Sequence, residues 1–335
     1  MSRLRYIDGI RDGIREEMLL DERVYVMGED VVPGGPFGAT KGLAEEFGEG
    51  RVLDTPISEE SVMGTAIGSA AVGYRPVLEV MFADFLTLVM NQLVNHAAKL
   101  HYMSGGQLKI PLTIRAQQGA SGSFGAHHSQ SLEAWFAHVP GLKVVAPSDP
   151  ADAKALMRAA IREDGPVLYL EHRGLYWSKQ EVDDDAGPAV IGEAAIRRPG
   201  TDVTVIALSK AVGTALDAAK QLEGEGVSVE VLDLRTISPL DTDAIIASVR
   251  RTRRAVILHE AVVSGGIGGE IAARIQEHAF ADLAAPVARV GGPFAPVPSS
   301  PPLEKFFVPD VAAVVGAVQA VMAGSASPTP ASRAI

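Results

Sequence analysis

The chain has 335 residues, a formal net charge of −11 and no cysteine. A single core rarely grows beyond about 250–300 residues, so this length and the 47% hydrophobic content favour two domains. The 41 acidic against 30 basic residues, with no evident basic run, argue against a nucleic-acid-binding surface. The lack of cysteine excludes disulfides, thiolate nucleophiles and cysteine metal sites, and is compatible with a reducing cytoplasm.

The N-terminal half predicts an alternating β/α series. Charged and apolar residues alternate at helical spacing over residues 6–20, without the apolar core of a signal peptide. No segment is apolar enough to predict a membrane span. The apolar residues of 84–102 are too dense for a surface helix, so a buried helix is expected there. The other expected elements are strands at 24–27, 51–54, 76–82, 110–116, 142–146 and 166–171, a Gly/Pro loop at 28–40, and helices at 59–72, 131–137 and 150–163.

The composition changes after this series, because residues 178–187 are polar and acidic. A second, smaller series is expected after it, with strands near 203–207, 228–232, 255–259 and 287–290 and helices near 210–223, 241–250, 267–280 and 310–323. Residues 291–302 are too rich in Pro and Gly for regular structure. The fold class predicted is α/β with two doubly wound domains. The expected bounds are 1–180, a linker at 181–200, a second domain at 201–324 and a disordered tail at 325–335.

Polar side chains follow three of the expected strands. Glu59 comes after the strand that ends at Asp54, Phe85 follows the strand that ends at Phe82, and His127 with His128 lies in a Gly/Ser-rich loop. The loops at the carboxyl ends of parallel strands share one edge of the sheet, where such folds bind ligands. The sequence therefore predicts a site built from a carboxylate, an aromatic ring and an imidazole.

Each of these residues also has a purely structural interpretation. Glu59 suits the first turn of a helix, where the dipole favours an acid, as well as a partly buried carboxyl group that exchanges a proton with a ligand nitrogen. Phe82 and Phe85 are core residues by default, although one exposed face suits stacking on a planar heterocycle. Adjacent histidines point apart on extended chain, which disfavours zinc and leaves a single imidazole for acid–base work.

One glycine-rich segment gives only a weak signal. GGIGGE at 265–270 is preceded by Glu260 and followed by no fitting dinucleotide fingerprint, so the start of a helix is the better interpretation. A GDG motif with a downstream Asn for Mg²⁺ and a diphosphate is missing from the sequence.

Taken together, several segments resemble a known family, the β subunits of thiamine-diphosphate-dependent 2-oxo acid dehydrogenases, which are transketolase-like. The family includes the pyruvate, branched-chain 2-oxo acid and acetoin dehydrogenases. The matching segments occur in family order and are DTPISE (54–59), FADF (82–85), AAKLHYMSGG (97–106), the loop at 119–131, PGLKVVAPSDPADAK (140–154), GPVLYLEH (165–172) and LDLRTISPLD (232–241).

The resemblance implies a pyrimidine-binding domain followed by a transketolase C-terminal domain. It assigns Glu59 to the acid that contacts N1′ of the aminopyrimidine and promotes its imino tautomer. It assigns Phe85 to the aromatic residue packed against the pyrimidine, and His128 to the histidine linked to stabilising intermediates and to acyl transfer; His127 has no such match. A separate α subunit would bind the diphosphate and Mg²⁺, which explains the missing motif and implies a heterotetramer of two α and two β subunits.

Some members also hold a structural K⁺ through backbone carbonyls. The matching positions here are Leu112, Ala160, Ile161, Glu163 and Gly165, of which the last two differ from the Asp and Asn of pyruvate-type members. Glu60 adds a negative charge that either perturbs the Glu59 carboxyl or faces water. Near the C-terminus, Phe294 and Ser299 replace an acid and an aromatic residue in the region where relatives meet the dihydrolipoyl acyltransferase, which makes that docking less secure.

The activity expected from the resemblance is oxidative decarboxylation of a branched-chain 2-oxo acid or pyruvate, with acyl transfer to lipoamide. Alternatives are acetoin cleavage and a transketolase-like carboligation. A non-catalytic scaffold subunit is the alternative from another class, and retention of Glu59, Phe85 and His128 argues against it.

Overall fold

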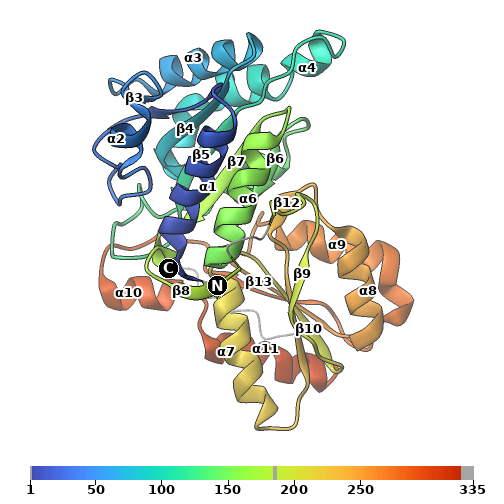
Figure 1. The fold of residues 1–335 in the computed structure, drawn as a ribbon. Helices are drawn as coiled ribbons and strands as arrows, with labels where there is room; N and C mark the ends of the chain where they lie inside the picture. The colour runs from blue at the N-terminus through green and yellow to red at the C-terminus, as the bar shows by residue number, and fades with distance from the viewer. Residues whose placement is uncertain (1, 184–186, 326–335) are drawn as a thin grey trace. The chain divides into compact units, whose positions relative to one another are not determined.

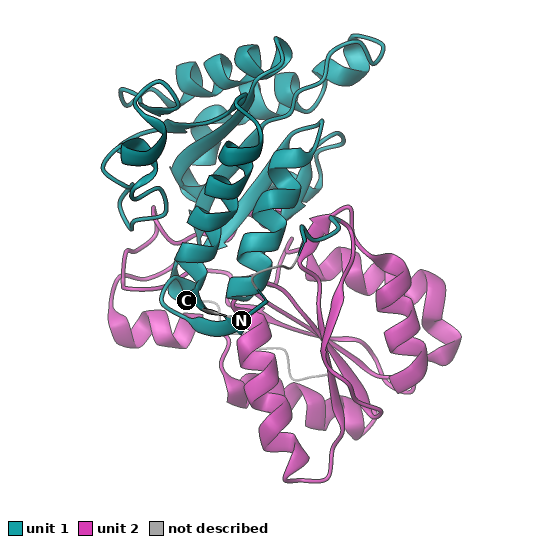
Figure 2. Cartoon of the chain, in the orientation of Figure 1, with its two compact units in different colours: residues 1–118, 135–191 teal, residues 119–134, 192–335 magenta. Residues whose placement is uncertain are grey.

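The computed structural model describes residues 2–183 and 187–325, which form two compact units. The first comprises Met1–Gln118 and Trp135–Ile191, and the second comprises Gly119–Ala134 and Gly192–Ile335 (Figure 2). The loop that carries the histidines therefore groups with the C-terminal half of the chain. The expected tail lies, from residue 326 onward, outside the described residues.

A parallel sheet forms the centre of the first unit. Its strands run in the order β6-β7-β5-β4-β2-β3, and every neighbouring pair among them is parallel. Their bounds are β2 (Val24–Gly28), β3 (Val52–Asp54), β4 (Arg75–Phe82), β5 (Thr113–Gln118), β6 (Lys143–Val145) and β7 (Val167–His172). A short antiparallel pair joins β1 (Ser2–Arg5) to β8 (Lys179–Val182). The helices are α1 (Tyr6–Leu20), α2 (Leu43–Phe47), α3 (Glu59–Ala71), α4 (Leu100–Met103), α6 (Pro150–Arg162) and the 3₁₀ turn Arg173–Leu175, while α5 (Glu133–Ala137) begins in the second unit and ends in the first.

Helices α1 and α6 lie side by side on this sheet (Figure 1). The apolar spacing of α1 places Ile10 and Ile14 in the same core as Met157 of α6. A Cβ at Gly9 would lie 2.7 Å from the Pro150 carbonyl oxygen, and one at Gly13 would lie 3.0 Å from Met157 Cβ. The two glycines therefore permit the close approach of the helices.

The second unit is built on a smaller sheet of order β14-β13-β10-β11-β9, in which only the β11–β9 pair is antiparallel. Its strands are β9 (Ala195–Arg198), β10 (Val203–Ala207), β11 (Val229–Asp233), β13 (Ala255–Val262) and β14 (Ala288–Gly292), and β12 (Thr236–Ser238) is a further short strand. Its helices are α7 (Ala211–Glu223), α8 (Thr242–Thr252), α9 (Gly268–Ala279), α10 (Pro301–Phe307), α11 (Val311–Met322) and the 3₁₀ turn Phe280–Asp282. The predicted α/β class with two parallel-type sheets is confirmed.

Some expected elements differ from the structure. The single helix expected at 84–102 is a 3₁₀ segment (Ala83–Val89), a π segment (Asn91–Ala97) and α4. A stretch that is apolar on all sides shows no single face, so its pattern does not report how the backbone winds. The expected linker contains β9, which pairs with the edge of the second sheet.

The C-terminal region differs from the sequence-based expectation in two respects. The stretch expected to lack regular structure contains the end of β14 and the start of α10, whose first residues are prolines, as helix N-termini allow. By length and composition alone, Pro301–Met322 would also pass as a membrane-spanning helix, contrary to the expectation from the sequence. Residues 308–310 interrupt that stretch, and α11 packs Val314 and Val318 into the core of the second unit.

Candidate functional site

The carboxyl ends of β2, β3 and β4 meet at one edge of the first sheet because these strands are parallel neighbours. Glu29 directly follows β2, Glu59 begins α3 after β3, and Phe85 follows β4. These residues line one depression, together with Thr55, Val62 and Val80. The structure thus brings Glu59 and Phe85 together, at the edge where the sequence predicted them.

Glu59 is half-buried in the first turn of α3. Its position satisfies both interpretations drawn from the sequence, since the helix dipole favours a carboxylate there and the depression exposes it to a ligand. Glu60, the next residue, is exposed. Its extra charge therefore faces water.

Two further polar groups of this depression were missed from the sequence. Burial, together with the charge of Glu59, raises the pKa of Glu29. The hydroxyl oxygen of Thr55 is buried and has no hydrogen-bond partner among the described residues. Buried hydroxyl groups are rarely left unpaired, so Thr55 is suited to a polar ligand atom.

The two phenylalanines at the end of β4 have different environments. Their rings meet edge to face, with centroids 5.6 Å apart and planes at 79°. Phe82 is buried, and the Arg173 guanidinium lies 5.7 Å from its ring centroid. Phe85 is only half-buried. Phe82 is therefore a core residue, and Phe85 is the ring accessible to a planar ligand.

A buried charge network lies under this edge of the sheet. The Arg115 guanidinium on β5 donates to Glu79 on β4 at 2.8 Å and to both oxygens of Glu171 on β7, at 2.6 and 3.1 Å. The Tyr176 hydroxyl also donates to Glu171, at 2.8 Å. Glu79 itself lines the depression beside Glu59. The network therefore connects Glu79, which lines the depression, with the neighbouring strands β5 and β7.

The histidine loop is attached within the second unit. The backbone amide of Ala120 donates to the Glu260 carboxylate, and that of Ser123 donates to Glu304 at 2.7 Å. His127 is exposed, whereas His128 is half-buried and its backbone amide donates to the Gly125 carbonyl at 3.3 Å. Glu59 and Phe85 belong to the first unit and His128 to the second.

A cavity of about 310 Å³ lies beside this loop in the second unit. Its lining is apolar except for a few polar groups, and includes Ser129, Gln130, Leu132, Glu260, Phe294 and Phe307. The hydroxyl of Ser129 is buried without a partner among the described residues. Phe294, one of the departures noted in the sequence, borders the cavity and is 79% exposed.

The glycine-rich segment 265–270 has a packing role. Helix α9 begins at Gly268, which confirms the start of a helix expected there. A Cβ at Gly268 would lie 2.8 Å from Nε2 of the buried His259. Burial lowers the pKa of His259 to about 4, so this ring is neutral and packs as an uncharged group.

Glu133, at the start of α5, is a buried acid with a raised pKa near the histidine loop. It is fully buried, one of its carboxyl oxygens has no partner among the described residues, and burial raises its pKa to about 7, with a contribution from Glu260. The unfolded chain releases this proton near pH 4.5 and the folded chain near pH 7. The contribution of the Glu133 carboxyl group to the stability of the folded chain is therefore complete below pH 4.5, and it is lost as the pH rises to 7.

Replacing Glu133 by Gln is expected to stabilise the chain by about 3 kcal/mol at pH 8, because the amide carries no charge to bury. Below pH 4.5 the variant and the original chain should be about equally stable. Unfolding followed by denaturant at both pH values measures the difference, with the exposed Glu49→Gln as a control that should show no such trend. An advantage of Glu133→Gln that is the same at both pH values would contradict the assignment.

The carbonyl groups matched to a K⁺ site lie around the C-terminal end of α6 and the start of β5. The Arg75 guanidinium donates to two of them, those of Ile161 and Glu163, at 2.9 Å each. Nothing in the sequence pattern singled out Arg75 as their partner.

Comparison with family models matches residues 2–178 to the transketolase pyrimidine-binding domain and residues 192–314 to the transketolase C-terminal domain. Among curated proteins, the chain is 46% identical over 311 residues to the 2-oxoisovalerate dehydrogenase subunit beta of Bacillus subtilis (strain 168), covering 92% of this chain and 95% of that protein. It is 45% identical over 315 residues to the pyruvate dehydrogenase E1 component subunit beta of Rickettsia felis, covering 94% and 97%.

The chain is also 44% identical over 315 residues to the acetoin:2,6-dichlorophenolindophenol oxidoreductase subunit beta of Bacillus subtilis, covering 90% and 92%. Among solved structures, an inactive β4 tetramer of a split-gene transketolase superposes with a TM-score of 0.82 at 25% identity, over 96% of this chain and 99% of that one.

Proposed function

The chain belongs to the β subunits of the thiamine-diphosphate-dependent 2-oxo acid dehydrogenases, and from this premise we propose that it acts in the oxidative decarboxylation of a branched-chain 2-oxo acid or pyruvate. In this proposal the acyl group passes to lipoamide of a dihydrolipoyl acyltransferase, and the enzyme acts in the cytoplasm. The observation that supports the proposal best is the depression in which the half-buried Glu59 lies with Phe85 and with the buried hydroxyl of Thr55, which pairs with no group within residues 2–183 and 187–325.

These residues fit the aminopyrimidine ring of thiamine diphosphate. The carboxyl group of Glu59 suits proton exchange with the ring nitrogen N1′, and the accessible face of Phe85 suits the flat ring. The buried hydroxyl of Thr55, which has no partner in the part of the chain that the structure describes, suits a polar atom of that ring. When bound, the cofactor supplies the electron sink for cleaving the bond next to a carbonyl. An α subunit holds the diphosphate and Mg²⁺ in this proposal, so this chain alone is inactive.

His128 is proposed to act on the acyl group after decarboxylation. His128 is half-buried, whereas its neighbour His127 is exposed. The loop that carries both is fixed by hydrogen bonds from its backbone amides to Glu260 and Glu304. A group held in place in this way transfers protons more effectively than a freely moving one.

His128→Ala is expected to slow acyl transfer to lipoamide by about 10²–10⁴-fold while slowing the initial decarboxylation much less. His127→Ala is the matched control, with the same chemical change one residue away and no expected loss. Single-turnover assays of the complex with an α-type partner separate the two steps. Equal losses in both steps would contradict the assignment.

The substrate is tested by co-expressing the chain with the α-type subunit and assaying decarboxylation with an artificial electron acceptor. Pyruvate, branched-chain 2-oxo acids and acetoin are compared with and without thiamine diphosphate. Cofactor-dependent turnover of one acid supports the dehydrogenase and names its substrate. Cofactor binding without turnover of any acid would contradict it.

Acetoin cleavage is the second candidate, because the acetoin-oxidising relative is nearly as similar to this chain as the other two relatives are.

The altered C-terminal region favours an enzyme that does not dock an acyltransferase, such as a carboligase, since Phe294 and Ser299 are both exposed there. Acyl transfer to lipoamide by the assembled pair would argue against that alternative. Full turnover by a Glu59→Ala enzyme would favour a non-catalytic scaffold instead.

A further inference from the structure

The C-terminal end of α6 needs a positive charge. The last four carbonyl groups of a helix have no partner within the helix, and this end carries the negative pole of the helix dipole. Helix α6 ends at Arg162, and Glu163 follows in an extended conformation. Either a bound cation or a cationic side chain can satisfy the carbonyl oxygens exposed here.

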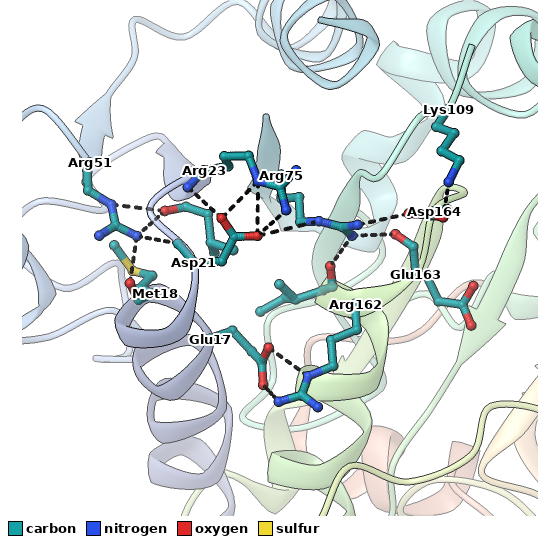
Figure 3. Close-up of polar contacts among 12 residues, drawn as sticks. Glu17, Met18, Asp21, Arg23, Arg51, Arg75, Lys109, Arg162, Glu163 and Asp164 are labelled. Atoms are coloured by element: carbon teal, nitrogen blue, oxygen red, sulfur yellow. Dashed lines mark hydrogen bonds and ion pairs between the residues drawn. The ribbon is translucent and has the colours of Figure 1, made fainter. Parts of the chain in front are cut away.

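Arg75, the first residue of β4, supplies that charge (Figure 3). One guanidinium nitrogen donates to the carbonyl oxygens of both Ile161 and Glu163, at 2.9 Å, and a second donates to the Asp164 carboxylate at 2.8 Å. The Arg75 side chain is only 17% exposed. Its planar group is thus fixed by three acceptors at the helix end.

Other groups of the expected K⁺ set are also engaged. The Leu112 carbonyl accepts from the backbone amide of Val167 at 2.9 Å, and the Ala160 carbonyl accepts from that of Glu163 at 3.3 Å. The Glu163 carboxylate is paired with Lys143.

The surrounding charges disfavour a second cation. Asp164 pairs with both Arg75 and Lys109, at 2.8 and 2.6 Å. Asp21 pairs with Arg23 at 2.7 Å and lies 3.8 Å from Arg75. Hydrogen bonds from these cations lower the pKa of both aspartates, so both are ionised at neutral pH. Three cationic side chains thus face these two carboxylates, so that neither Asp21 nor Asp164 offers an unpaired negative charge to an ion.

We propose that the Arg75 guanidinium is the built-in cation of this helix end, and that the chain folds and assembles here without a bound K⁺. This disagrees with the ion expected from the resemblance. It concerns only the first unit and does not depend on the substrate.

Thermal unfolding of the full chain, alone and with its α-type partner, tests the proposal in KCl, NaCl and choline chloride at equal ionic strength. The unchanged chain should unfold within about 1 °C of the same temperature in all three salts. Arg75→Met should lower the unfolding temperature by about 5 °C in each salt, because three charge-assisted hydrogen bonds are lost.

Arg23→Met is the matched control, since Arg23 pairs with the same Asp21 but is exposed and reaches neither carbonyl group. It should shift the unfolding temperature by only about 1 °C. An Arg75→Met chain as stable as Arg23→Met would contradict the proposal.

Two results on the unchanged chain overturn the proposal even if Arg75→Met does not fold. One is an unfolding temperature that rises saturably with K⁺ but not with Na⁺ or choline. The other is an anomalous scattering peak among these carbonyl oxygens in crystals grown with Rb⁺, which replaces K⁺ at oxygen sites. A featureless Rb⁺ map supports the built-in cation.

Discussion

Glu59→Gln is expected to lower cofactor-dependent turnover by about 10²–10⁴-fold while leaving folding and assembly intact. The amide has the shape of the carboxyl group, so packing in the first turn of α3 is preserved. It cannot exchange a proton with N1′ of the aminopyrimidine, however, and half-burial of the residue limits rescue by water. The direct measurement is exchange of the C2 proton of bound thiamine diphosphate by NMR, which should slow with turnover.

The neighbouring Glu60→Gln is the control for this substitution. It removes the same charge one residue away, from an exposed side chain, and should leave both exchange and turnover nearly unchanged. Calorimetric titration of the assembled pair with the cofactor separates binding from activation. C2 proton exchange in Glu59→Gln at the rate of the original complex would falsify the role proposed for Glu59.

The local features of this site were predictable from the sequence. Helix α1 begins and ends at the expected residues, because its apolar positions recur at helical spacing. Glu59 and Phe85 meet because β3 and β4 both pair with β2 in parallel, and parallel strands keep their carboxyl ends on one edge of the sheet. These features depend on neighbours in the chain, or on a regular rule of the sheet.

The groups that the sequence did not reveal depend on contacts between distant residues. Arg75 and Ile161 are 86 positions apart, and Arg115 and Glu171 are 56 apart. An arginine within a strand shows no sign of its partner in the sequence. The loop at 119–134 likewise follows β5 in the chain yet groups with the second unit, through acids at Glu260 and Glu304 that no local pattern connects to it.

Arg115→Met is expected to destabilise the first unit by about 3–5 kcal/mol, which corresponds to a fall of roughly 10 °C in unfolding temperature. The guanidinium is 1% exposed and lies between Glu79 and Glu171, whose side chains are also buried. Removing it leaves two carboxylates close together without a counter-charge. The structure can then lower the cost by taking up a proton at Glu79, because burial, with the charge of Glu171, raises the pKa of this carboxyl.

The pH dependence of this loss distinguishes buried charge from lost packing. In the variant, acids with a raised pKa in the folded state stabilise it at low pH and cease to do so as the pH rises, so the deficit should be larger at pH 8 than at pH 5. Arg15→Met is the matched control, since Arg15 pairs with Glu46 at 2.6 Å but the two side chains are 44% and 35% exposed. That surface pair should contribute about 0–1 kcal/mol.

If the loss of stability in Arg115→Met does not change with pH, or matches that of Arg15→Met, the charges of the network do not stabilise the first unit. A partial recovery on adding Glu79→Gln and Glu171→Gln would show instead that the uncompensated carboxylates cause the loss.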